Sequence, residues 1–161
     1  MSIQDTYATA SSITVSISSG ANPTINIPPT KEGKFASSGA TTIGVTTNHA
    51  SGYTLTATAT ALTDNTNTIA TLPANTAINA ATFADASSDT YNNKWGYLPS
   101  QYCTSSSISS CVSNITSQYY LPAPTSGQVI DITNDNTSGN TYTMAIGARL
   151  DYTIAQGIYT T

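Results

Sequence analysis

The sequence predicts an all-β fold: a two-sheet antiparallel β-sandwich, immunoglobulin-like or jelly-roll-like, with a long irregular insertion. Three observations support this fold class. Apolar side chains recur at every second position in several segments, which is typical of strands with one buried face. About a third of the residues are Ser or Thr, and the branched Cβ of Thr suits a pleated surface. Short segments alternate with Gly, Asn and Pro turns. A closed barrel is the alternative.

The length of 161 residues predicts one domain spanning residues 1–161. Within it, residues 1–10 are expected to be flexible or exchanged with a neighbouring copy. Strands are expected at Ser12–Ser18 and Thr24–Ile27, and Pro28 and Pro29 should end the second because proline cannot donate to a ladder. Ile13, Val15 and Ile17 share one face of the first strand, and Ile25 and Ile27 are expected to face inward in the second. Lys31–Phe35 is expected to be a charged connection whose Phe35 covers the edge of the core.

The clearest pattern in the chain is Thr41–Thr60, TTIGVTTNHASGYTLTATAT. Ile43 and Val45 alternate with polar residues before a turn, and apolar residues from Tyr53 onward alternate with threonines after it. The turn contains Asn, His, Ser and Gly, residue types common in loops, and Asn and Gly tolerate positive φ. The segment therefore predicts a β-hairpin with one buried face.

The pattern is irregular between residues 61 and 86, where we expect a loop with one or two short strands, or a helical turn near Ala77–Ala81. Strands are expected again at Gln128–Thr133 and Thr141–Leu150, separated by the strong turn signal NDNTSGN at residues 134–140. A last strand is expected to begin at Gly157 and to stop at Thr161.

Residues 98–122 are predicted to form a loop insertion closed by a disulfide between Cys103 and Cys111 in CTSSSISSC. By chain entropy such a short loop closure contributes roughly 2–3 kcal/mol. Two free thiols are the alternative. A metal site would need two further ligands, and His49, the only histidine, is distant in sequence. A disulfide indicates an extracytoplasmic location.

Charged residues make up only 7% of the chain and the formal net charge is −4. Nucleic-acid binding requires a basic surface, so this balance argues against it. Attraction to anionic membranes is excluded by the same charge, and no apolar run reaches the ~20 residues of a spanning helix. We therefore expect no nucleic-acid partner and no membrane insertion by this segment.

No residue pattern indicates catalysis, and we expect no enzymatic activity, cofactor or metal. His49 lies among hydroxyl residues in a predicted turn. The carboxylate pairs Asp85/Asp89 and Asp131/Asp135 lie in or beside turn-rich stretches, where Asp usually caps the backbone. Calcium binding around Asp131 and Asp135 would not follow the spacing of an EF-hand loop.

Aromatic residues are the best candidates for binding, because Tyr and Trp offer stiff amphipathic surface. Trp95 is expected to anchor the core, as the tryptophan of immunoglobulin-like sandwiches does. Tyr119 and Tyr120 point to opposite faces if extended, so only one of them is expected to be exposed. The tyrosines considered as ligand or partner contacts are Tyr97, Tyr102, Tyr119 and Tyr120.

Three motifs occur in a fixed order: the Thr41–Thr60 segment, KWGY at residues 94–97 and TYTMAIGARLDYTIAQGIYTT at the end. Together they resemble the Thr/Ser/Asn-rich β-sandwich domains of large surface proteins of Patescibacteria such as Saccharibacteria. The residues that match this family's pattern are Thr47, Asn48, Gly52, Tyr53, Thr54, Leu55, Trp95, Gly96, Tyr97, Gly147, Asp151, Gly157, Ile158, Tyr159 and Thr160. The CTSSSISSC loop departs from it as an insertion. The closing strand stops at Thr161, where relatives continue, so we expect further residues or another strand in that place.

The resemblance implies secretion, a cell-surface location and a structural or adhesive role. The sequence thus predicts a non-enzymatic extracellular module of a bacterial cell-surface protein. Its expected partners are neighbouring copies or domains of the same surface protein, with a host-cell protein or glycan as further candidates. Two alternatives remain: a pilus-like filament subunit assembled by strand exchange, and a carbohydrate-binding module that uses the tyrosines.

Overall fold

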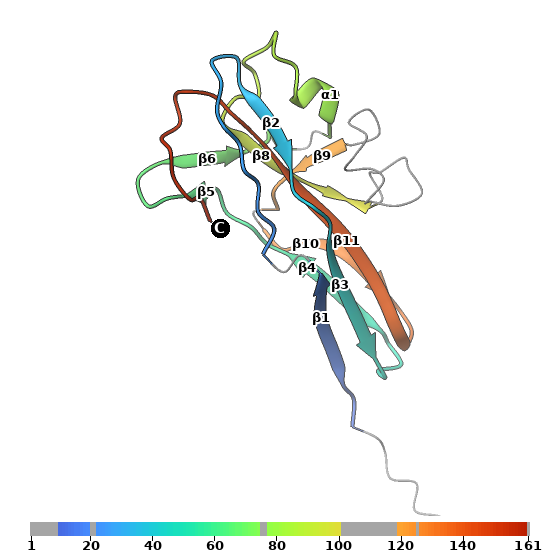
Figure 1. Ribbon diagram of the computed structural model, residues 1–161. Coiled ribbons are helices and arrows are strands. Elements are labelled where there is room, and N and C mark those ends of the chain that lie inside the picture. Colours follow the sequence, from blue (N-terminus) through green and yellow to red (C-terminus); the bar gives the residue numbers. More distant parts are fainter. Residues whose placement is uncertain (1–9, 20–21, 75–76, 101–118, 125, 161) are drawn as a thin grey trace, which may run out of the picture.

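The protein is an all-β sandwich in which strands account for 50% of the residues and helix for 4%. The computed structural model describes residues 10–160 apart from 20–21, 75–76, 101–118 and 125 (Figure 1). A nine-stranded sheet with the path β1-β3-β11-β8-β6-β5 faces a two-stranded sheet of β10 and β4. The elements are β1 (Ile13–Ser19), β2 (Lys34–Ser37), β3 (Thr41–Thr47), β4 (Tyr53–Ala57), β5 (Leu62–Thr63), β6 (Thr68–Thr71), β7 (Ile78–Asn79), α1 (Ala80–Phe83), β8 (Lys94–Pro99), β9 (Tyr119–Pro122), β10 (Gln128–Thr133) and β11 (Thr137–Leu150).

Strand β11 is the long axis of the molecule and joins its two halves, as Figure 1 shows. Its first residues pair with β3, with Tyr142 opposite Ile43. Its last residues lie between β2 and β8, so that Ala148 is opposite Ala36 on one side and Trp95 on the other. The lower half consists of β1, β3, β4, β10 and the start of β11. The upper half consists of the remaining elements.

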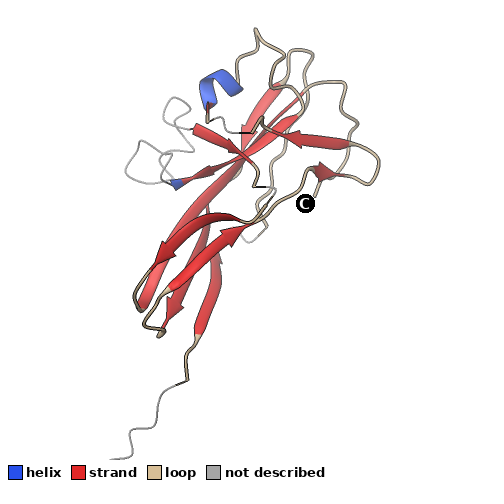
Figure 2. Cartoon of the chain, turned by 180° about the vertical axis from the view of Figure 1, so that it is seen from behind, coloured by secondary structure: helices blue, strands red, loops and turns tan. Residues whose placement is uncertain are grey.

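In the lower half, the turn at residues 48–52 joins strands of different sheets. β3 pairs with β1 and β11, whereas β4 pairs only with β10. The prediction of a hairpin at Thr41–Thr60 is therefore wrong, although both strands and the turn are present. Val45 and Tyr53 are both buried, which indicates that the apolar faces of β3 and β4 meet across the core (Figure 2). Gly52 has a φ of 68° and lies so close to the backbone of Thr133 that a side chain would clash.

In the upper half the main sheet is covered on both faces. One face carries an aromatic cluster in which the Phe83 ring of α1 lies 5.0 Å from Phe35 and 5.8 Å from Tyr120, centroid to centroid. The opposite face carries a second cluster around Trp95, which packs with Ile69, Ala123 and Ala148. Trp95 is thus a core residue.

Several segments differ from the sequence-based expectations. Thr24–Ile27 is not a strand, because prolines flank it and no neighbour pairs with it; its isoleucines still pack against the Trp95 cluster. Lys31–Phe35 is not wholly a connection, since β2 begins at Lys34. The described part of Gly157–Thr161 is not a strand, and its Thr160 forms an isolated bridge with Thr63. The irregular region 61–86 contains three short strands and one helical turn.

The bounds expected for the predicted insertion, residues 98–122, are wrong at both ends. β8 extends to Pro99, and β9 begins at Tyr119 and pairs with β8 through Tyr97 and Leu121. Both ends of the segment therefore belong to the main sheet. Cys103, Cys111 and the bond expected between them lie outside the described residues.

Candidate functional site

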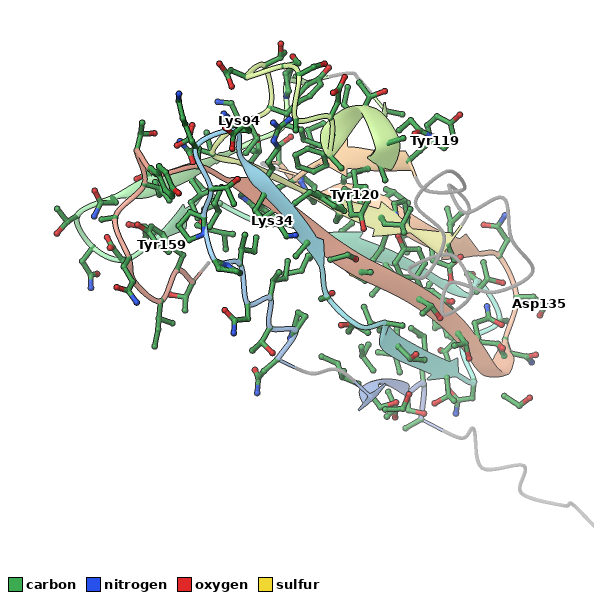
Figure 3. The ribbon with its side chains drawn as sticks, turned by 45° about the horizontal axis from the view of Figure 1, so that its top comes forward. Lys34, Lys94, Tyr119, Tyr120, Asp135 and Tyr159 are labelled. Carbon is green, nitrogen blue, oxygen red and sulfur yellow. The ribbon has the colours of Figure 1, made fainter. Side chains whose placement is uncertain are left out.

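The tyrosines considered as binding residues are divided between core and surface. Tyr97 is buried and its hydroxyl donates to Gln128 Oε1 at 3.2 Å. Tyr120 is fully buried and its hydroxyl donates to Ser37 Oγ at 2.8 Å. A surface contact is therefore wrong for these two residues. Tyr119 is 38% exposed, and Figure 3 shows it outside the cluster that contains Tyr120. Tyr102 lies outside the described residues.

Burial also determines the titration of the inner tyrosines. It raises the pKa of Tyr120 to about 12, although the hydrogen bond to Ser37 lowers that pKa. Tyr142 has its pKa raised by burial and by the nearby Tyr97 and Asp131. The Tyr142 hydroxyl is buried without a hydrogen-bond partner among the described residues. Both side chains are therefore neutral at physiological pH, and neither is placed to meet a ligand.

The histidine and the carboxylates are engaged in turns. His49 is exposed, and its Nδ1 accepts a hydrogen bond from the Ser51 amide at 3.2 Å. Asp85 accepts from the amide and hydroxyl of Ser87, which lower its pKa. Asp135 accepts from the Asn136 amide. These contacts are the backbone caps that Asp and His form in loops.

Two further carboxylates bridge segments that are distant in sequence. Asp131 accepts a hydrogen bond from the hydroxyl of Tyr53, which joins the two strands of the smaller sheet on their inner face. Asp151 accepts from Asn93 Nδ2 at 2.9 Å and from Thr153, and these bonds hold the end of β11 beside the turn before β8. Burial raises the pKa of Asp151, but these hydrogen bonds lower it more.

A shallow hollow of about 440 Å³ lies at the lower end of the molecule. Hydroxyl and amide groups line it: Ser12, Thr46, Thr47, Asn48, Asn136, Thr137 and Ser138. Several of these groups already bond within the protein, as Asn48 does to Ser12 and Ala10. The hollow can donate and accept hydrogen bonds. In the described part of the chain, no three His, Cys, Asp or Glu side chains gather as metal ligands would.

Arg149 is a buried cation that the sequence pattern did not reveal. Its side chain is 0% exposed, and its guanidinium donates to the carbonyl oxygens of Glu32, Phe83 and Asp85. Nε has no partner among the described residues. Since its contacts are backbone carbonyls of two loops, Arg149 fastens these loops to β11 and stabilises the fold.

Several large apolar side chains remain exposed for contact, among them Tyr119, Tyr152 and Ile158. Ile13, Val15 and Ile17 of β1 are 57%, 54% and 52% exposed. These three side chains are called the β1 stripe below. Val129 and Ile132 on the outer face of β10 are also more than half exposed. The sequence predicted the strand and the shared face of the β1 stripe.

Searches with the whole chain against protein-family models, curated proteins and solved structures give no match. No helix among the described residues is long and apolar enough to cross a membrane.

Proposed function

We propose that this chain is a non-enzymatic module of an extracellular bacterial surface protein, with a structural or adhesive role. The observation that supports this most is how its reactive side chains are used. His49 and the aspartates of the turns hold the backbone, and the buried tyrosines hold the core. Such a distribution suits a protein that acts through its shape and surface.

The shape suits a spacer. β11 has 14 residues, which corresponds to roughly 46 Å at about 3.3 Å per residue. Both halves of the molecule are built on this one strand. Figure 1 shows β1 at the lower end and the C-terminal end beside the upper half. In a longer protein, flanking segments would therefore leave the module at different ends.

The surface composition suits an extracellular location. Only four residues are Lys or Arg, and one of these, Arg149, is buried. Lys31 and Lys34 are exposed and Lys94 is half-buried, so trypsin-like proteases have few places to cut. The outer faces of β1 and β4 carry Ser and Thr, whose hydroxyl groups hydrate the surface without charge.

The test is surface exposure in the organism that encodes the protein. Antibodies raised against the purified domain should label intact cells, and brief protease treatment of those cells should remove the signal. Labelling that requires permeabilised cells would overturn the extracellular role. The non-enzymatic role is tested with panels of glycan, ester and peptide substrates. We expect no turnover, and steady turnover that scales with protein concentration would refute it.

A filament subunit assembled by strand exchange is a second candidate, favoured by the edge of β1 that pairs with no strand of the described structure. An open edge is a template for a strand from a neighbouring chain. In that case residues 1–10 of one copy would add to the edge of the next. Electron microscopy of concentrated protein should show fibres, and a chain that lacks residues 1–9 should not form them. Fibre formation by the shortened chain would exclude this assembly mode.

A further inference from the structure

The β1 stripe continues the inner face of the sandwich beyond the edge of the smaller sheet. Val15 is directly opposite Val45 in the antiparallel β1–β3 pair, and Ile17 is opposite Ile43. Residues directly opposite in such a pair lie on the same face of the sheet. Val45 is 1% exposed, whereas Val15 is 54% exposed. The same face is thus covered at β3 and uncovered at β1.

The cause is a strand missing from the second layer. β4 is joined to β3 by the short turn at residues 48–52, which places β4 across from β3. β10 is joined to β11 by residues 134–136 and lies across from β11. Because β4 pairs only with β10 in the described structure, its other edge points toward β1. The second layer therefore ends one strand short of the first.

The edge of β1 has neither the charge, nor the proline, nor the short length that protects most edge strands, and its irregularity is a register shift between Ile17 and Ser19 near its end. Native edge strands are protected by charged residues, prolines or very short length. β1 has seven residues, ITVSISS, without charge or proline. No charged residue occurs in the sequence between Asp5 and Lys31, and none occurs from β3 through β4. Figure 3 shows Asp135 at the lower tip and Lys34 and Lys94 in the upper half.

We propose that a second copy of this chain covers the β1 stripe with its own β1 stripe. The stripe is symmetric about Val15, with an isoleucine two residues away on either side, so it can pack on itself about a two-fold axis. β1 of the second copy would then occupy the vacant place beside β4. β1 of the first copy would occupy the corresponding place beside β4 of the second. Such an isologous contact uses each open edge once and closes at two copies.

An identical partner fits this surface better than a charged one. A residue at a two-fold axis meets its own copy, so a charge there would face a like charge, and β1, β3 and β4 carry no charge. The exposed stripe is a contiguous patch on the order of a few hundred Å², the size at which patches mark interaction sites. Two stripes and the adjoining edges approach the lower range of stable interfaces, roughly 1,200 Å². The inference rests on the proposed structural role, because such a module acts by contacting neighbours.

The test is the oligomeric state of four purified proteins, measured by analytical ultracentrifugation over a wide concentration range. They are the wild-type chain, Val15→Lys, Ile132→Lys and a chain without residues 1–9. Ile132 is the matched control, because it is 59% exposed on the outer face of β10, away from the stripe. Both substituted side chains are exposed in one copy, so circular dichroism spectra that match that of the wild-type chain should show that both variants fold.

We expect a concentration-dependent dimer for the wild-type chain, for Ile132→Lys and for the shortened chain. Val15→Lys places two charges in the contact and should weaken dimerisation at least about 100-fold. A monomeric wild-type chain, or a Val15→Lys variant that dimerises normally, would overturn the inference. Loss of the dimer on removal of residues 1–9, or growth beyond two copies, would overturn it in favour of strand exchange. A monomer that is nevertheless displayed on cells would leave the proposed function intact.

Discussion

Replacing Arg149 by methionine should destabilise the fold strongly. Arg149 is the only buried side chain with a formal charge in the described structure, and burying a charge costs free energy. Its guanidinium holds the carbonyls of Glu32 and Asp85, and at longer distance that of Phe83. Methionine keeps much of the side-chain length and apolar volume, so the change removes mainly the charge and these hydrogen bonds. The Glu32 carbonyl and the end of α1 would then lose the contact that fixes them to β11.

The expected magnitude follows from these bonds. Two good hydrogen bonds to a charged group contribute roughly 1.5–3 kcal/mol each. The desolvation of the buried cation, several kcal/mol by general estimates, offsets part of that sum. We therefore expect a loss of about 3 kcal/mol in the free energy of unfolding. For a domain of this length each kcal/mol lowers the melting temperature by roughly 2–4 °C, which gives about 6–12 °C.

Urea unfolding followed by far-ultraviolet circular dichroism measures this loss. Lys34→Met is the matched control, because Lys34 is an exposed cation in β2 opposite Leu150 of β11. It should change stability by no more than about 0.5 kcal/mol. Arg149→Lys should recover little, since one ammonium cannot reach carbonyls of two separate loops as the guanidinium fork does. A loss below about 1 kcal/mol in Arg149→Met would refute the role of Arg149 as a loop clamp.

Three further outcomes are expected from urea unfolding. Tyr142→Phe should raise stability by up to about 1 kcal/mol, because it removes a buried hydroxyl without a described partner; a marked loss would reveal a hidden partner. Gly147→Ala should cost about 1–3 kcal/mol, because its Cβ would lie 2.5 Å from the Tyr120 ring; Gly139→Ala, in open space, should be neutral. Burial raises the pKa of Tyr120 to about 12, so Tyr120 ionises in the unfolded chain at a lower pH than in the folded protein. Its contribution to the free energy of unfolding is therefore complete below pH 10 and is lost between about pH 10 and 12. Tyr120→Phe should make the decline of stability over this pH range smaller.

The alternation of apolar and polar residues predicted the strands best where one face of the sheet is exposed to solvent. β10 has the predicted bounds Gln128–Thr133, and β1 lies within one residue of the expected segment. The pattern says which side chains share a face, but it does not say which strands are neighbours. For that reason Thr41–Thr60 gave both strands correctly and the wrong pairing. The close approach of Gly52 to Thr133 is a tertiary feature that local turn chemistry cannot reveal.

The pattern fails where both faces of a strand are buried. Alternation in Thr141–Leu150 places Ala148 and Leu150 on one face of the strand and Arg149 on the other. The structure buries the opposite face as well, because α1 and β9 cover it with Phe83 and Tyr120. A signal was present in the small residues on the Arg149 face. Ala145 and Gly147 leave space for large rings from elsewhere in the chain. Small residues at alternate positions of a strand can therefore indicate that this face of the sheet is covered by other side chains.

The shortage of charge explains why contact through β1 is a natural consequence of this composition. With 7% charged residues, the chain cannot protect each sheet edge with lysine or glutamate, the usual means. Other edges are limited by geometry: β2 and β5 have four and two residues, and Thr63 of β5 exchanges backbone hydrogen bonds with Thr160. β1 is longer, neutral and flanked by an uncovered aliphatic face. A surface that depends on hydroxyl groups for solubility leaves such an edge open to association, and a second copy of the chain matches both the shape and the lack of charge of this edge and its aliphatic face.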